Sequence, residues 1–190
     1  IVGWMEDHGV YKVSTQVEGQ KVIFNEYCAY MFAGLDDLDM IDFLMTDTQY
    51  VVIMSNMFSL CKSLTTLDLK PFYTKNVVCM DSMFKGCEKL SDIDLSNFDT
   101  SNVKDMSRMF EDCKSLKKLN LSNFDTSRVK MMSRMFLLCI ELNDIQFKEF
   151  HTENVTDMSY MFYGCNSFED LTLEGWNLQN VNKMDEMFAY

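Results

Sequence analysis

Five of the seven cysteines are candidates for chemistry, because they recur at one fixed interval of 26 residues: Cys61, Cys87, Cys113, Cys139 and Cys165. Thiols that bind zinc stand in C-x-x-C pairs or beside histidines, and the sequence has neither arrangement. We therefore predict reduced thiols that fill one repeating core position. Cys28 takes a position held elsewhere by Met, so it also reads as core. Cys79 takes the position of Asp105 and Asp157, so we expect it to face solvent and to be reactive.

The two histidines, His8 and His151, are the candidates for a general base near neutral pH. His151 occupies a loop position that holds Asp99 and Asp125 in the preceding repeats, and no nucleophile has a comparable place beside it. The seven glycines form no phosphate-binding cluster. We therefore predict a protein that is not an enzyme and carries no cofactor, with His151 a solvated loop residue.

Asp42, Asp68 and Asp94 also stand 26 residues apart. Carboxylates side by side at ~5 Å repel by ~1 kcal/mol per pair in water, which favours a cation or a basic partner. This row is a weak calcium candidate; the alternative is a solvated acidic face with raised pKa values. Lys118 interrupts the acidity of a neighbouring row, and with Asp94 it is a candidate contact for a protein ligand.

The interval of 26 residues belongs to a repeat that must position all of these side chains. A Met-Phe pair returns seven times: Met31-Phe32, Met57-Phe58, Met83-Phe84, Met109-Phe110, Met135-Phe136, Met161-Phe162 and Met187-Phe188. Coincidence does not give seven copies at one step with no insertion, so the chain is a repeat protein.

Each repeat begins with an L-x-x-L-x-L pattern, as in Leu90, Ile93 and Leu95, whose alternation predicts a strand. A large apolar residue such as Phe98 follows at the corner. Apolar positions 103, 106, 109, 110 and 113 then have the spacing of one helical face. We predict an α/β solenoid of the leucine-rich-repeat type: a right-handed coil with a parallel sheet on the inner face and short helices on the outer face.

Residues 1–24 do not fit the repeat. The segments 11–17 and 21–24 predict two strands joined at Gly19, a β-hairpin that caps the first repeat. The solenoid then covers residues 25–190. The chain stops one residue before the next cysteine position, so we expect it to be truncated at the C-terminus, part of a longer array.

The net charge of −12 makes nucleic acid a poor partner. No apolar run approaches ~18 residues, so the sequence predicts no membrane span. The acidity is concentrated early: residues 1–60 hold nine acidic side chains against Lys12 and Lys21. It either keeps an apolar-rich solenoid soluble or attracts a basic partner.

The run D-L-S-N-F-D-T-S-N-V-K-D-M-S-R-M-F-E-D-C (residues 94–113) resembles the bacterial BspA-like leucine-rich-repeat surface proteins, and the resemblance covers residues 25–190. The opening W-x-x-x-x-G-V-Y is similar to the segment that precedes the first repeat in these proteins. The resemblance implies a bacterial protein displayed outside the cell, at its surface, as a non-enzymatic adhesion or host-interaction module. A host or cell-surface protein is then the expected ligand. The alternative is a spacer or stalk that holds another domain away from the cell.

One repeat breaks its own polar pattern and predicts a protein contact. Residues 137–140 read Leu-Leu-Cys-Ile where the preceding repeat has Glu-Asp-Cys-Lys. Neighbouring positions add to a possible apolar patch, whose members are Met131, Leu137, Leu138, Ile140, Tyr160 and Tyr163. We interpret this patch as an interface, self-association included. Alternatives are that another segment covers it, or that Leu138 packs inside.

Overall fold

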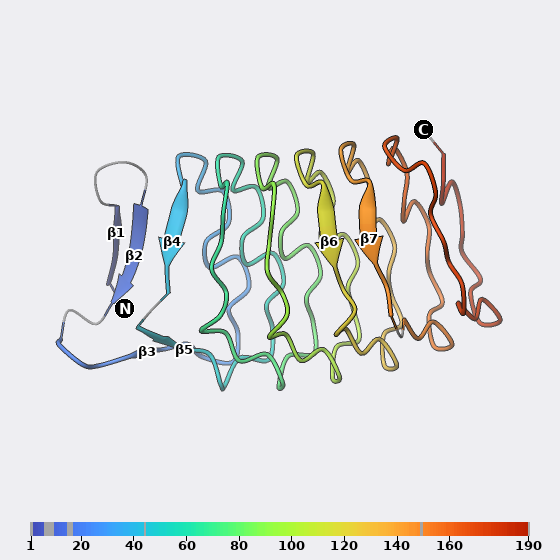
Figure 1. Ribbon diagram of the computed structural model, residues 1–190. Helices are drawn as coiled ribbons and strands as arrows, with labels where there is room; N and C mark the ends of the chain where they lie inside the picture. The colour runs from blue at the N-terminus through green and yellow to red at the C-terminus, as the bar shows by residue number, and fades with distance from the viewer. Residues whose placement is uncertain (1, 6–9, 15–16, 44, 149, 190) are drawn as a thin grey trace.

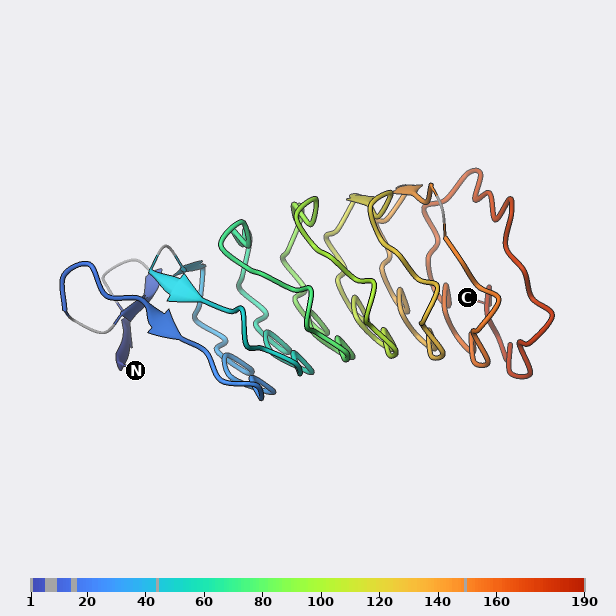
Figure 2. The same cartoon turned by 90° about the horizontal axis from the view of Figure 1, so that it is seen from below.

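The computed structural model describes residues 2–5, 10–14, 17–43, 45–148 and 150–189. The repeats stack into a solenoid, with the two ends of the chain at opposite ends of the stack (Figure 1). Each turn of the coil has a front wall, built from the L-x-x-L-x-L segments, and a back wall, built from the segments that carry Met-Phe. Figure 2 shows the stack from below with the two walls on opposite sides.

The front wall has the predicted alternation of buried and exposed residues but little regular pairing. β6 (Lys118–Asn120) and β7 (Asp144–Gln146) pair in parallel, and β4 (Met40–Asp42) is the other strand in these segments. Two repeats lie between β4 and β6, and in the second of them Leu90, Ile93 and Leu95 are buried as predicted, without a strand. The burial pattern is therefore confirmed, whereas a continuous sheet on this wall is not.

The continuous ladder between repeats lies instead on the back wall, where helices were predicted. One residue of each repeat forms a parallel bridge to the next, in the order Tyr27, Ile53, Cys79, Asp105, Met131, Asp157 and Lys183. Alternate N–H groups after each bridge also donate to the following repeat, as from Asn56 to the carbonyl of Asp81 (2.9 Å) and from Phe58 to that of Met83 (2.9 Å). Parallel pairing thus fixes each back-wall position into a row along the solenoid.

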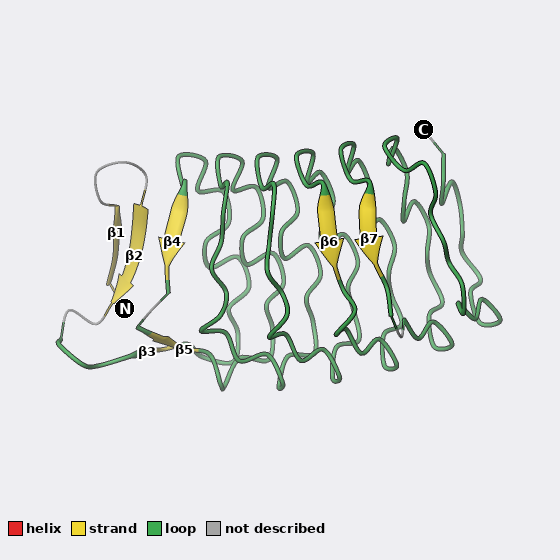
Figure 3. Cartoon of the chain, viewed as in Figure 1, coloured by secondary structure: helices red, strands yellow, loops and turns green. Residues whose placement is uncertain are grey.

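The predicted outer helices are wrong: no helix occurs among the described residues (Figure 3). The intervening N–H groups close four-residue turns with i→i−3 bonds, as from Met57 to Met54 and from Cys61 to Phe58, instead of helical i→i−4 bonds. Asn56 and Leu60 have φ of 56° and 61°, in the left-handed region, which interrupts a helix. Successive turns bury the same positions that a helix would bury, so the spacing misled the prediction.

The N-terminal cap exists, but with other strands than predicted. β1 (Val2–Met5) and β2 (Val10–Ser14) form the antiparallel hairpin, and β2 pairs in parallel with β4. β3 (Val22–Ile23) pairs in parallel with β5 (Thr46–Asp47), so this segment belongs to the solenoid wall. The proposed pairing of 11–17 with 21–24 is therefore wrong. Gly19, with φ of 76°, turns the chain from one sheet to the other.

Candidate functional site

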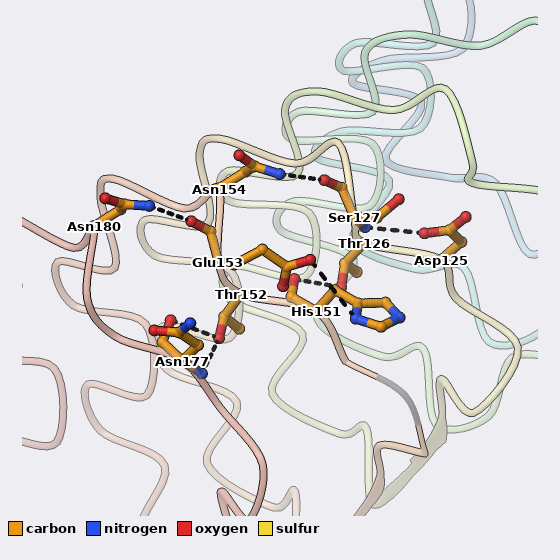
Figure 4. A network of polar contacts seen from close by, with 9 residues as sticks. All are labelled: Asp125, Thr126, Ser127, His151, Thr152, Glu153, Asn154, Asn177 and Asn180. Atoms are coloured by element: carbon orange, nitrogen blue, oxygen red, sulfur yellow. Dashed lines mark hydrogen bonds and ion pairs between the residues drawn. The ribbon is translucent and has the colours of Figure 1, made fainter.

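Rows of polar side chains bind each repeat to the next and thereby position the surface residues. The buried Thr74 hydroxyl donates to the carbonyl of Asp99 (3.0 Å) and accepts its N–H (2.8 Å). Thr152 makes the same pair of bonds to Asn177, as Figure 4 shows. These contacts hold the corner of each repeat in register with its neighbour.

Asparagine side chains form two further rows. Asn123 donates from Nδ2 to the carbonyls of Leu95 (3.0 Å) and Phe98 (3.0 Å), and Asn97 makes the equivalent contacts one repeat earlier. In the second row Asn154 donates to the carbonyl of Ser127 (2.7 Å; Figure 4). The chain thus bridges its repeats with amides, although its asparagines stand one residue earlier than in the ordinary leucine-rich repeat.

The cysteine row is a structural row, as the sequence indicated. All seven cysteines lie within the described residues and are free thiols. Each of the five in the repeat donates to the carbonyl of a core phenylalanine in the preceding repeat, as from Cys61 to Phe32 (3.0 Å). Burial raises the pKa of Cys61 to about 11 and that of Cys165 to about 12, and it also raises the pKa of the fully buried Cys113. These thiols are poor nucleophiles at neutral pH.

Alkylation of the native protein should therefore label Cys79 first. Cys79 does not face solvent as expected: it is half-buried, and burial raises its pKa. Its thiol donates to Asp81 Oδ1 (3.2 Å) and accepts from Ser55 Oγ (3.3 Å), so it is less shielded than the core row but not an activated thiol. Cys165 is half-buried too and should follow, while Cys87, Cys113 and Cys139 stay protected until the protein unfolds. Mass spectrometry over time measures this order. Fast labelling of the whole row would place it outside the core.

His151 lies on the surface without a nucleophile beside it. Its Nδ1 atom is 3.8 Å from Glu153 Oε1, and its backbone carbonyl accepts the Thr126 hydroxyl (2.8 Å; Figure 4). In the described part of the chain, no serine, threonine or cysteine side chain hydrogen-bonds to the imidazole. The side chain therefore fits the predicted loop role. His8 lies outside the described residues.

The acidic row faces solvent on the front wall, with Asp42 half-buried and Asp68 and Asp94 exposed. Asp68 and Asp94 each accept the N–H group two residues ahead, at 3.0 Å. Hydrogen bonds from Ser96 lower the pKa of Asp94, so the expected raised pKa is wrong for this residue. The described residues hold no group of three or more His, Cys, Asp or Glu placed for a metal ion. The geometry thus gives the calcium hypothesis no support.

Lys118 lies in β6, and its Nζ is 3.9 Å from Asp144 Oδ2 on the adjacent strand. The Lys118–Asp144 contact agrees with the prediction of a second charged row beside the acidic row of Asp94. Its side chain is largely exposed, so Lys118 stays a candidate contact, as does Asp94.

The structure brings the predicted apolar residues together on and beside the back wall. Ile140 is 42% exposed, and the other members of the patch are half-buried. Leu138 packs over Gly164 in the next repeat, while Tyr160 contacts Tyr163 (5.8 Å between ring centroids) and lies under Arg134. We call these residues, Met131, Leu137, Leu138, Ile140, Tyr160 and Tyr163, the leucine patch. Because Leu138 packs against Gly164, its side chain is partly withdrawn from the surface. This finding is close to the alternative in which Leu138 packs inside.

A more exposed group was missed at the other end of the solenoid. Ile23, Tyr27, Tyr50 and Tyr73 are 58%, 71%, 55% and 47% exposed. The first three line a hollow of about 460 Å³ together with Phe24, Asn25 and Glu26. Ile23 pairs with Asp47, and Tyr73 occupies the position of Asp47 in the next repeat. Tyr73 therefore lies near the other three residues. We call these four residues the tyrosine surface.

The same sequence signal that marks the leucine patch marks this surface too. Tyr50 takes a position held by asparagine in four other repeats, and Tyr73 takes that of Asp99 and Asp125. Reading the early repeats for broken positions would have found it.

Comparison with known proteins places this architecture in a family. The family described as "Mycoplasma protein of unknown function, DUF285" matches residues 26–136 and 88–190. The chain belongs to the DUF285 family. The matched ranges together cover the whole predicted solenoid except its first residue, so DUF285 membership and the 26-residue repeat describe the same part of the chain.

A solved structure supports the fold of this DUF285 chain. The crystal structure of the Treponema pallidum leucine-rich-repeat protein is similar over 84% of this chain and 67% of that chain, with a TM-score of 0.53 and 20% identity. The leucine-rich-repeat type of fold is thus confirmed, and the likeness carries nothing beyond the fold. No curated protein matches the sequence. No helix in the described residues is long and apolar enough to cross a membrane.

Proposed function

We propose that this chain is a non-enzymatic protein-binding module that contacts its partner through the tyrosine surface. The supporting observation is the exposure of Ile23, Tyr27, Tyr50 and Tyr73 at positions where other repeats mostly carry polar residues. Tyrosine rings give large contact areas at a small cost in conformational entropy, and they are enriched at binding hot spots. Isolated exposed apolar side chains are ordinary, but a group around a hollow is not.

The charge around this surface favours a basic partner. Glu26 lines the hollow and Asp47 lies beside Ile23. In the wider N-terminal region the acidic side chains greatly outnumber the lysines. Complementary charge at the rim speeds association and selects among partners, while the aromatic centre supplies affinity. The partner is therefore a protein with an apolar anchor and a basic rim.

Display on the outside of a bacterial cell is part of the same proposal. It is supported by the resemblance of residues 25–190 to bacterial surface proteins. The burial of the repeating thiols is compatible with an oxidising environment, because thiols with raised pKa values react slowly. On this view the partner is a host or cell-surface protein, and the leucine patch is a site of self-association.

To test the proposal, Tyr50 and Tyr73 are each replaced by the residue that stands at the equivalent position of other repeats. The double variant Tyr50→Asn with Tyr73→Asp should fold normally, because Asn76 and Asp99 show how these side chains fit. We expect fluorescently labelled protein to bind cultured animal cells, and the variant to bind at least about tenfold more weakly. Trypsin treatment of the cells should abolish binding if the partner is a protein.

The matched control changes the leucine patch in the same manner, by Leu137→Glu with Ile140→Lys. The proposal expects a small effect on cell binding, with any change confined to the molecular mass in solution. If the tyrosine variant binds as well as the parent, the tyrosine surface is not the interface. If neither variant loses binding, or the parent binds no cells, the spacer function is favoured.

A further inference from the structure

A second row of back-wall residues begins close to the tyrosine surface, since Tyr30 follows Tyr27 by three residues. Its first four members have nearly the same φ, between 55° and 58°, and are Tyr30, Asn56, Ser82 and Arg108; the row then continues through Arg134 and Tyr160. Each donates its backbone N–H to the following repeat, at 2.8–3.1 Å. Because the backbones match, the four side chains leave the wall in equivalent geometry. These four residues cover three steps of ~4.8 Å, or about 14 Å in all.

This row lines a groove of about 500 Å³, which Leu60 and Lys85 also line. Tyr30 is 64% exposed and offers a ring face at one end. Asn56 and Ser82 offer short donors and acceptors in the middle, and Arg108 offers a planar set of donors at the other end. The groove therefore presents one aromatic face and a line of side-chain hydrogen-bonding groups.

A buried carboxylate holds the two cations of this groove. Glu111 is 6% exposed; its Oε1 is 2.8 Å from Lys85 Nζ, and its Oε2 is 3.6 Å from Arg108 Nε. Oε2 is buried and has no hydrogen-bond partner. A buried acceptor without a donor is uncommon in folded proteins. Glu111 itself does not line the groove, so it acts from behind the wall and holds Lys85 and Arg108 in place for a ligand.

The charges in and behind the groove cancel. Lys85 and Arg108 carry two positive charges, while Glu111 and Asp81, which also lines the groove, carry two negative ones. The site is thus electrically neutral on a protein with a net charge of −12. Neither a strongly anionic nor a strongly cationic ligand is favoured by this balance.

The backbone of the row has no free donors for a peptide strand. The N–H groups of Tyr30, Asn56, Ser82 and Arg108 are already used between repeats, whereas strand addition needs free backbone groups. Sugar rings need only side chains: a C–H face packs on an aromatic ring and hydroxyls bond to polar groups. We propose that this groove binds a short neutral saccharide, with one ring on Tyr30 and its hydroxyls on Asn56, Ser82 and Arg108.

The experiment titrates the protein with three neutral trisaccharides: maltotriose, cellotriose and triacetylchitotriose. Saturation-transfer NMR detects bound sugar, and the ring signals of Tyr30 report its place. We expect at least one sugar to bind with an affinity in the millimolar range or tighter, and Arg108→Asn or Tyr30→Asn to weaken it by about tenfold or more. Asparagine already occupies this row at Asn56, so both variants should fold.

The control is Arg128→Asn, which makes the same chemical change in a row where Asn102 and Asn154 stand, away from the groove. It should leave sugar binding unchanged. The proposal is overturned if none of the sugars binds at about 10 mM, or if Arg128→Asn weakens binding as much as Arg108→Asn. A random hexapeptide mixture that binds in an Arg108-dependent manner, with no sugar bound, would reassign the groove to peptides and also overturn it.

Discussion

Phe110→Ala is expected to lower the free energy of unfolding by about 3–5 kcal/mol. The ring is fully buried and stacks between Phe84 and Phe136, with ring centroids 5.6 Å and 5.8 Å away. Truncation removes apolar contacts on both sides and leaves a cavity that neighbouring repeats cannot fill, because the back-wall ladder fixes their spacing. Urea denaturation followed by circular dichroism measures the change.

The control is Phe188→Ala, in the same row at the last described Met-Phe pair. Phe188 is 50% exposed and, among the described rings, stacks only on Phe162 (5.7 Å). Its loss should cost about 1–2 kcal/mol, in line with partial burial. Equal losses at the two positions would mean that the phenylalanine row does not run through the core.

Thr74→Val is expected to cost about 3 kcal/mol, although it hardly changes the shape of the side chain. The hydroxyl of Thr74 serves both the carbonyl and the N–H of Asp99, at 3.0 Å and 2.8 Å. Valine leaves both groups without this partner at a buried corner, and each unpaired buried group costs about 1–3 kcal/mol. The same denaturation experiment measures the loss.

Thr65→Val is the matched control, because Thr65 is exposed on the front wall. Its effect should stay within about 0.5 kcal/mol. If Thr74→Val were as mild, water or a shifted backbone would satisfy Asp99, and the threonine row would not hold the repeats together.

The sequence was sufficient to predict which positions are buried, but not the backbone that buries them. Val103, Met106, Met109, Phe110 and Cys113 are all fully buried, as expected of a helical face. A helix and a chain of turns give the same 3-4-7 spacing. What distinguishes them is the left-handed residue at Arg108 and Asp112. Glycine holds the position of Asp112 at Gly34, Gly86 and Gly164, so the sequence carried a signal for this turn that the helical spacing outweighed. The bonds that decide the matter run between repeats, so no single repeat reveals them.

The candidate surfaces were predictable where a repeat broke its own pattern. Leu137 and Ile140 were found in this way, whereas Tyr50 and Tyr73 were missed although they break the pattern equally clearly. The groove was beyond sequence reasoning, because it depends on the matching backbones of Tyr30 and Arg108 and on the ion pairs by which Glu111 holds its cations. Only the spatial stacking of repeats brings these residues together.

The back-wall ladder underlies both proposed surfaces, and NMR detection of couplings across hydrogen bonds tests it most directly. The structure predicts couplings that join the N–H of Asn56 to the carbonyl of Asp81, and that of Phe58 to the carbonyl of Met83. Couplings from these N–H groups to carbonyls four residues earlier would instead show helices on this wall. That result would break the rows and contradict the account.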